Sequence, residues 1–200
     1  NSSNDTNCIE LLGKPVYIPY YQDGFDGINS GWNVSTSGTT ATIWQLGTPN
    51  YGQTNSAYSA PNCWDINLTS AYTENANTAL ISPWFDLSSS INPILTFMQN
   101  RNTELYNGGF YIQWATPASL TWTTLGTYND PIATNWYNQT TSFPFPGPFW
   151  HGASNGWEKS KYPLTGILPT NLPVQFRIVF MSSSTNLVQD GVSIDDFKVE

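Results

Sequence analysis

The sequence is poor in charge, and above all in positive charge. Charged residues make up 10 % of its 200 positions, and six Lys and Arg stand against fourteen Asp and Glu, for a net charge of −8. Soluble domains usually carry about a quarter of charged residues, so uncharged polar side chains must cover this surface. Nucleic acids and anionic membranes both require a basic footprint. The longest basic grouping, Lys159 to Lys161, has two charges, and we therefore exclude both partners.

Long hydrophobic runs and soft metal ligands are scarce as well. No apolar run approaches the roughly 20 residues that span a bilayer, so we expect no membrane insertion. Two cysteines, Cys8 and Cys63, and a single histidine cannot form a four-ligand zinc site without carboxylates. We expect Cys8 and Cys63 to form a disulfide, the alternative being two buried thiols. No signal peptide precedes Asn1, and we interpret the sequence as a mature or excised segment of a secreted protein.

Aromatic residues, in contrast, are abundant at 15 %. Short aromatic and β-branched runs separated by Gly, Pro, Asn and Ser predict strands and no ordinary helix. The predicted strands cover residues 16–20, 32–34, 42–46, 79–81, 94–98, 109–116, 122–125, 157–164, 174–181 and 192–199. We expect Pro83 to end the strand at 79–81. In the strand at 174–181, Val174, Phe176, Ile178 and Phe180 should share one face.

This pattern predicts an all-β fold, specifically an antiparallel two-sheet jelly-roll sandwich in a single domain. We assign residues 13–200 to the sandwich and residues 1–12 to a short N-terminal linker. Residues 128–156 form a long, irregular segment rich in proline and aromatic residues. Loops of this length within a compact domain are usually functional.

Several short motifs follow one another over residues 16 to 199. They are Phe25-Asp26 with Gly31-Trp32, Trp44-Gln-Leu-Gly47, Cys63-Trp64-Asp-Ile-Asn67-Leu68 with Tyr72, Leu80-Ile-Ser82-Pro83-Trp-Phe-Asp86-Leu87-Ser88, Asn92-Pro93-Ile-Leu95-Thr-Phe97, Trp122-Thr-Thr-Leu125-Gly126 and Asp190-Gly191-Val-Ser-Ile194-Asp195-Asp196-Phe197-Lys-Val199. Their order resembles that of the MAM-like and cleaved-adhesin-like jelly rolls of secreted bacterial proteases, glycan-degrading enzymes and surface adhesins. The resemblance implies an extracellular module beside other domains of one parent chain.

Calcium is the cofactor that this resemblance implies, in a structural role between the first and last strands. Asp195 and Asp196 are neighbours on the last strand, so we expect one side chain to point inward, where a carboxylate must be paired or bind a cation. Asp26 would complete the site with Asp23 or Asp190 nearby, because calcium is held by several hard oxygens. The alternative is a surface pair with one carboxylate bound by backbone N–H groups.

Aromatic side chains are the second candidate site, since sugar rings pack on indole and phenol faces. Trp32, Trp44, Trp64, Trp122 and Trp157 lie within or beside predicted strands, and we assign them to the core. The predicted ligand-binding rings are Trp136, Tyr137, Phe149 and Trp150 in the long loop, with Tyr106 beside Asn107-Gly-Gly. The alternative is that the loop rings fold the loop onto the sandwich.

Catalysis finds little support. Gly152-Ala-Ser154-Asn155-Gly156 matches the nucleophile-elbow pattern, but that pattern requires a preceding strand and a following helix, and His151 is the single histidine. A glycosidase would use two carboxylates, and nothing selects a pair from the available ones, Glu74, Glu104, Asp130 and Glu158. We therefore predict a non-catalytic extracellular module that binds a polysaccharide or glycan. The alternatives are a protein-binding adhesin or spacer domain and, ranked third, a glycoside hydrolase or lyase.

Overall fold

The computed structural model is a sandwich of two β-sheets, and it describes residues 9–11, 13–27, 31–38, 41–119, 121–184 and 189–200. These residues form strands, turns and bends, with no helix among them, and thus none able to cross a membrane. The strands are β1 (Ile9–Leu11), β2 (Lys14–Tyr17), β3 (Tyr21–Asp23), β4 (Asn33–Thr36), β5 (Trp44–Gly47), β6 (Cys63–Ile66), β7 (Asn77–Phe85), β8 (Ile94–Asn102), β9 (Gly108–Ala115), β10 (Thr123–Thr124), β11 (Trp150–His151), β12 (Glu158–Pro163), β13 (Val174–Ser182) and β14 (Gly191–Val199).

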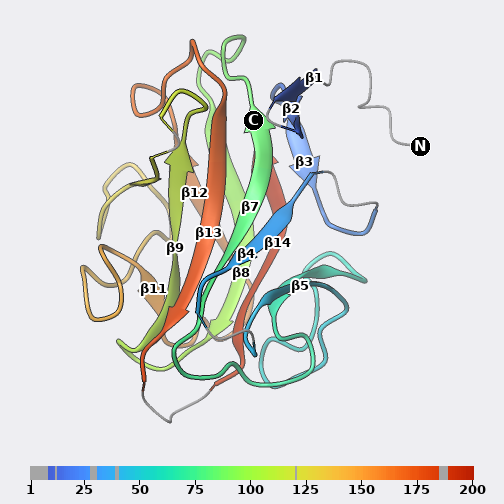
Figure 1. The fold of residues 1–200 in the computed structure, drawn as a ribbon, viewed down its shortest axis with the longest axis vertical. Helices are drawn as coiled ribbons and strands as arrows, with labels where there is room; N and C mark the ends of the chain where they lie inside the picture. The colour runs from blue at the N-terminus through green and yellow to red at the C-terminus, as the bar shows by residue number, and fades with distance from the viewer. Residues whose placement is uncertain (1–8, 12, 28–30, 39–40, 120, 185–188) are drawn as a thin grey trace.

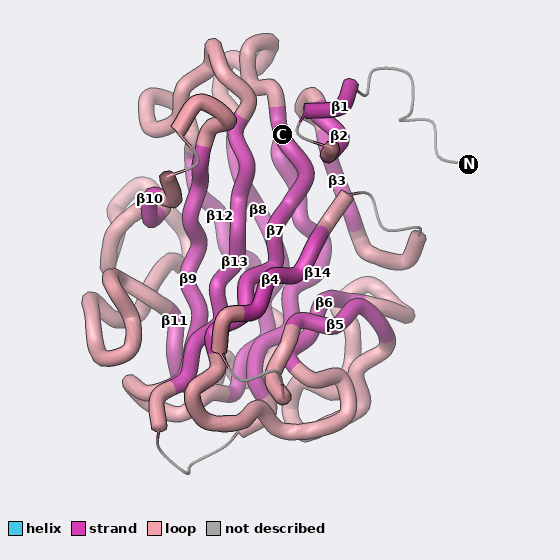
Figure 2. The backbone as a smooth tube through the Cα atoms, in the orientation of Figure 1, coloured by secondary structure: helices cyan, strands magenta, loops and turns pink. Residues whose placement is uncertain are grey.

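The two sheets pack face to face (Figure 1). Sheet A has the order β1-β2-β7-β13-β9-β10, with β4 also on β7 and β11 also on β9. Sheet B has the order β12-β8-β14-β6-β5, with β3 also on β14. All pairings are antiparallel except that of β2 with β7. The predicted two-sheet jelly-roll sandwich is confirmed, and the connecting loops gather at both ends of the long strands (Figure 2).

Alternation along β13 builds one wall of the core. Val174, Phe176, Ile178 and Phe180 are all fully buried, as predicted. Fully buried phenylalanines of the opposite sheet meet them, and the ring centroids of Phe176 and Phe197 are 6.2 Å apart. Arg177, which lies between Phe176 and Ile178 on β13, points to the outer side of sheet A.

Strand β7 continues through Pro83, where the sequence predicted its end. Proline cannot donate to a ladder and is accommodated in strands at bulges. The register between β7 and β13 shifts at this point, so that Ser82 and Pro83 stand opposite Phe176 alone. The Ser82 hydroxyl accepts the Phe176 N–H at 3.0 Å and donates to the Pro83 carbonyl at 2.7 Å. The Ser-Pro motif therefore encodes a bulge whose backbone groups are satisfied by the serine.

A second bulge lies at Asp195 and Asp196 in β14, where the register with β8 shifts by one residue. Asp196 has a positive φ of 46°. The inserted residue places both Ile194 and Phe197 in the core, three positions apart, which strict alternation would forbid. The bulge at Asp195 and Asp196 thus turns both carboxylates away from the core.

Part of the predicted linker 1–12 forms a strand in the described residues. Residues 9–11 form β1, which pairs with β2 and extends sheet A. Cys8 lies outside the described residues, so the predicted disulfide stays a prediction. Cys63 on β6 is fully buried, and burial raises the pKa of its thiol well above the usual value.

Candidate functional site

The four side chains of the long loop that were predicted to bind a ligand are core residues. Trp136, Tyr137, Phe149 and Trp150, predicted to contact a ligand, are all buried. Trp150 stacks on Phe110 of β9 at a centroid distance of 4.6 Å. This corrects the expectation of a binding surface, because burying these rings folds the loop onto the sandwich and leaves no face of them open to a sugar.

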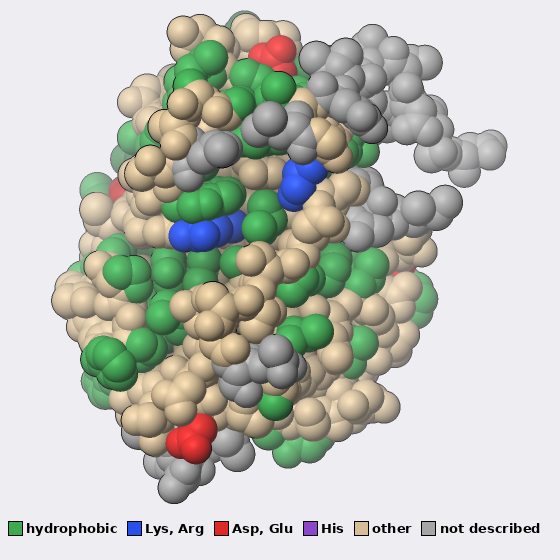
Figure 3. Space-filling model, in the orientation of Figure 1, with side chains coloured by type: hydrophobic (Ala, Val, Ile, Leu, Met, Phe, Trp, Pro, Cys, Tyr) green, Lys and Arg blue, Asp and Glu red, His purple; other side chains and the backbone are tan. Residues whose placement is uncertain are grey.

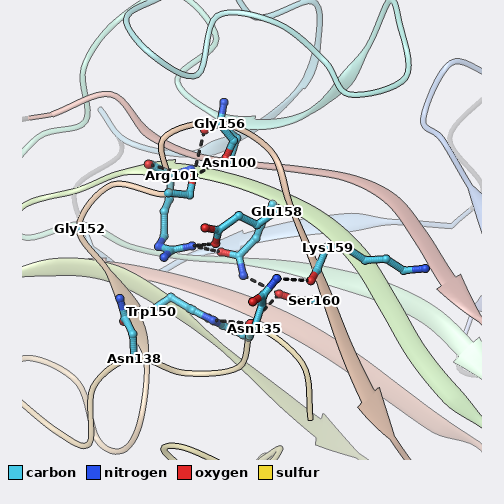
Figure 4. A network of polar contacts seen from close by, with 12 residues as sticks. Asn100, Arg101, Asn135, Asn138, Trp150, Gly152, Gly156, Glu158, Lys159 and Ser160 are labelled. Carbon is cyan, nitrogen blue, oxygen red and sulfur yellow. Dashed lines mark hydrogen bonds and ion pairs between the residues drawn. The ribbon is translucent and has the colours of Figure 1, made fainter.

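A polar network holds the same loop from its other side (Figure 4). Arg101 of β8 donates to Glu158 at 3.0 Å, to Gln99 at 2.9 Å and to the His151 carbonyl at 3.3 Å. The Asn135 carbonyl accepts hydrogen bonds from Ser160 and from the Trp150 indole. Arg101 and Glu158 therefore act together as a structural anchor of the loop.

Residues Gly152 to Gly156 lack the architecture of a nucleophile elbow. The Ser154 hydroxyl donates to the Gly156 carbonyl at 2.7 Å and accepts the Arg101 N–H. His151 Nδ1 is buried without a hydrogen-bond partner in the described part of the chain. Burial lowers the pKa of His151, and the nearby positive charge of Arg101 lowers it further. The serine is thus engaged in holding the backbone rather than in a pair with the histidine.

Tyr106 is the one predicted ligand-binding ring that lies at the surface. It is 51 % exposed and has a positive φ of 68°. One side of its ring packs on the His151 imidazole at a centroid distance of 4.7 Å. Tyr106 remains available for contact, whereas the other four predicted rings are buried.

The carboxylate of Asp195 is fully buried on the outer side of sheet B and accepts several hydrogen bonds. Its donors are the backbone N–H groups of Tyr58, Ser59 and Asp196, at 2.7 to 2.9 Å. Burial raises the pKa of Asp195 to about 6, while these donors pull it down. The arrangement is the alternative that the sequence left open, a carboxylate bound by backbone N–H groups.

The other four aspartates of the predicted calcium site have partners of their own. Asp196 accepts from the Ser59 hydroxyl at 3.0 Å, and Asp26 accepts the Asn62 N–H at 2.9 Å. Asp23 accepts the Phe25 N–H, and Asp190 accepts the Gln53 N–H. No three acidic, histidine or cysteine side chains come together as a metal-binding group among the described residues. The structure brings together only Asp195 and Asp196, which share the Ser59 hydroxyl.

The outer face of sheet A presents a different set of side chains, which the sequence analysis missed. Arg177 of β13 stands directly opposite Gln113 of β9, and its Nε donates to Gln113 Oε1 at 2.8 Å. The Arg177 guanidinium carbon lies 4.5 Å from the ring centroid of Trp122. Trp122, expected in the core, is only half-buried. Figure 3 shows this face, with basic side chains set among hydrophobic and uncharged ones.

Indole, guanidinium and amide form one platform at this position, which we call the Trp122 platform (Trp122, Arg177 and Gln113). Arginine carries five N–H donors in a planar fork, and Gln113 uses only some of them. Tyr111, next on the same face of β9, packs edge-on against Phe145 at 6.4 Å. An aromatic surface beside fixed donors and acceptors is the composition of a small-molecule or sugar site. An arginine at an outward position between core residues is the signal that could have revealed it.

Comparison with known proteins gives few matches by sequence. No protein-family model matches the chain. The chain is 25 % identical over 191 residues to Bacillopeptidase F of Bacillus subtilis (strain 168), a match that covers 96 % of the chain and 11 % of that protein. The chain thus spans about a tenth of the length of this curated relative.

Comparison of structures is more informative. The K1 cleaved adhesin domain of Lys-gingipain from Porphyromonas gingivalis W83 matches with a TM-score of 0.52 at 14 % identity, over 90 % of this chain and 96 % of that domain. The K3 domain of the same protein matches with a TM-score of 0.50 at 15 % identity, over 90 % and 97 %. The chain has the fold of the cleaved adhesin domains. A structure from the β-sandwich superfamily of carbohydrate-binding modules also matches, with a TM-score of 0.50 at 13 % identity, over 91 % of this chain and 62 % of that one.

The cleaved-adhesin fold confirms the resemblance that the ordered motifs predicted. Those motifs mark backbone features, such as the Ser82-Pro83 bulge and Asn67, which has a φ of 58°. The Asn67 side chain donates to the Ala41 and Ala71 carbonyls and accepts the Ile43 N–H. These motif residues therefore report the fold.

Proposed function

We propose that the chain is a non-catalytic extracellular module that binds glycans on behalf of a larger protein. The observation that carries the proposal is the Trp122 platform on the outer face of sheet A. The indole offers an apolar face to a pyranose ring, while Arg177 donors reach its hydroxyl groups and Gln113 holds the guanidinium in place. The fold shared with a carbohydrate-binding module and with adhesin domains supports this reading. The match to about a tenth of Bacillopeptidase F supports a place within a longer parent chain.

The test is retention on polysaccharide gels in affinity electrophoresis, across neutral and acidic polymers. We expect retention by at least one neutral polymer, lost in Trp122→Ala and weakened in Arg177→Met. Tyr106→Ala is the control variant, because its exposed ring lies outside the platform. Equal retention of the Trp122 variant and the unchanged chain would exclude the Trp122 platform as the binding site. Absence of retention by every polymer would exclude glycan binding.

A protein-binding adhesin is the second candidate, favoured by a groove near the chain end. Pro19, Tyr20, Ile91, Asn92 and Glu200 line this groove, whose volume is about 320 Å³. Tyr20 and Ile91 are among the most exposed large side chains of the protein. Substitution of both by Ser should abolish binding of a protein partner and leave glycan retention unchanged.

Structural calcium stays a prediction, centred on Asp195 and Asp196. Their Oδ1 atoms lie 3.2 and 3.0 Å from the same Ser59 hydroxyl. Thermal unfolding after chelation, with and without added calcium, tests it. Binding to the native state alone at 100 times the dissociation constant adds about 2.7 kcal/mol. We expect that gain to vanish in Asp195→Asn, and the same melting temperature with and without calcium would remove the prediction.

A further inference from the structure

Three of the six basic residues of this acidic chain gather on the outer side of sheet B. Lys159 and Lys161 lie on β12, and Lys198 lies on β14, with β8 between them. Each alternates with core neighbours, which directs its side chain outward. In the register, Thr96 of β8 stands opposite Lys161 on one side and Lys198 on the other. Directly opposite residues of antiparallel strands point to the same face, so both lysines flank Thr96.

Thr96, between the two lysines, has a buried hydroxyl. Its side chain is 1 % exposed, and its hydroxyl has no hydrogen-bond partner among the described residues. Thr96 lines a small groove of about 90 Å³, together with Lys159, Asp196, Lys198 and Tyr58. A buried hydroxyl without a partner costs free energy. A group that enters this groove can satisfy it.

An aromatic wall borders the groove. Tyr58, 52 % exposed, packs edge-on against Trp157 at a centroid distance of 6.0 Å. The Trp157 indole donates to the Ser56 carbonyl at 3.2 Å, which fixes the ring. Asp196 lies 3.9 Å from the Lys198 ammonium and leaves an acceptor facing the groove. Its negative charge favours a monoanion over a doubly charged phosphate.

We propose that this groove, which we call the lysine groove, binds the carboxylate of an acidic sugar, a hexuronate unit of a polysaccharide. The carboxylate lies between Lys159 and Lys198, which both line the groove, and accepts a hydrogen bond from Thr96. The pyranose ring lies against Tyr58 and Trp157. This site deepens the proposed function, because it rests on glycan binding by the chain and adds a second site with its own substrate class.

Calorimetric titration with a hexamer of galacturonate tests the proposal, with the fully methyl-esterified hexamer as the matched ligand. We expect the acid to bind and esterification to weaken binding at least tenfold. Binding should weaken as salt rises. Lys159→Met and Lys198→Met should each lower the affinity about tenfold, and Lys14→Met, on sheet A, should not. Equal binding of acid and ester, or insensitivity to both lysine variants, would overturn the proposal.

Thr96→Val separates a binding role from a structural one. Valine has the same shape without the hydroxyl, so the free protein should melt at a higher temperature while its affinity for the hexuronate falls severalfold. Unchanged affinity would contradict the assignment of Thr96, and equal binding of an acidic peptide would contradict the sugar. If neutral polymers retain the chain through Trp122 but the galacturonate hexamer does not bind, the proposed function is supported and the inference about the lysine groove is wrong. If the lysine variants weaken hexuronate binding as expected and Trp122→Ala does not change retention by neutral polymers, the lysine groove is supported and the Trp122 platform is excluded.

Discussion

Two long loops cover the sandwich, and they are held by opposite kinds of chemistry. Residues 125–149, the aromatic loop, insert Trp136, Tyr137 and Phe149 into the core and lead into Trp150 of β11. Residues 48–62, the polar loop, instead present backbone N–H groups to the carboxylates of Asp190 and Asp195. One loop is fixed by the burial of apolar rings, and the other by hydrogen bonds from its backbone to buried carboxylates. A loop rich in aromatic residues can therefore serve to stabilise the fold. The polar loop has fewer aromatic residues, yet it borders the lysine groove through Tyr58.

The aromatic loop should lose the most stability when its anchor is removed. Trp150→Ala deletes a side chain that is 1 % exposed and stacked on Phe110. Substitutions of this kind cost about 3–5 kcal/mol. Urea unfolding measures the free energy, and Phe143→Ala in the same loop, at a ring 77 % exposed, is the control, with an expected change within about 0.5 kcal/mol. Similar losses of stability in the two variants would contradict the claim that buried rings hold the aromatic loop in place.

The polar loop should respond to a single carboxylate. Asp195→Ala leaves the Tyr58 and Ser59 N–H groups without their acceptor, at a cost of about 1–3 kcal/mol. Hydrogen exchange should accelerate at these two amides and stay unchanged at Gln139, whose N–H is bonded to the Phe149 carbonyl. Asp86→Ala is the control, because Asp86 accepts an exposed N–H from Ser88. Uniform acceleration across both loops would show that they open together.

The smallest expected effect is a pH dependence of the stability, which arises from Asp195 beside the polar loop. Burial raises the pKa of folded Asp195 to about 6, above about 3.9 when unfolded. The folded state therefore holds this proton more tightly, and its stabilising contribution is complete below pH 3.9 and lost as pH rises through 6. His151, with its lowered pKa, acts in the opposite direction, so the readout is a difference between variants.

That difference is measured from melting temperatures at pH 5 and pH 7.5. The rise in melting temperature from pH 7.5 to pH 5 should be smaller in Asp195→Asn. It should persist in Glu74→Gln, a change at an exposed carboxylate. Trp150→Ala should melt lower at both values without altering the gain. A gain unaffected by Asp195→Asn would assign the titration to another group.

The sequence predicted the fold better than the site, for physical reasons. Alternation in residues 174–181 is a local pattern, so β13 and its core face were predictable. Pro83 was misjudged because its bulge depends on a serine hydroxyl meeting a distant strand. The loop rings could not be placed, since whether an aromatic ring is buried depends on Phe110 and other core partners far along the chain. The lysine groove could not be predicted, because Lys198 comes near Lys159 only through the pairing of β14, β8 and β12.

The most direct test of the account is an NMR titration that follows the nine tryptophan indole N–H signals as a retained neutral glycan is added. We expect the Trp122 signal to shift, with the signals of Trp136 and Trp150 unchanged. A galacturonate hexamer should instead shift the Trp157 signal. Shifts at Trp136 or Trp150, or none at Trp122 on saturation, would contradict the claim that the outer face of sheet A is the glycan site.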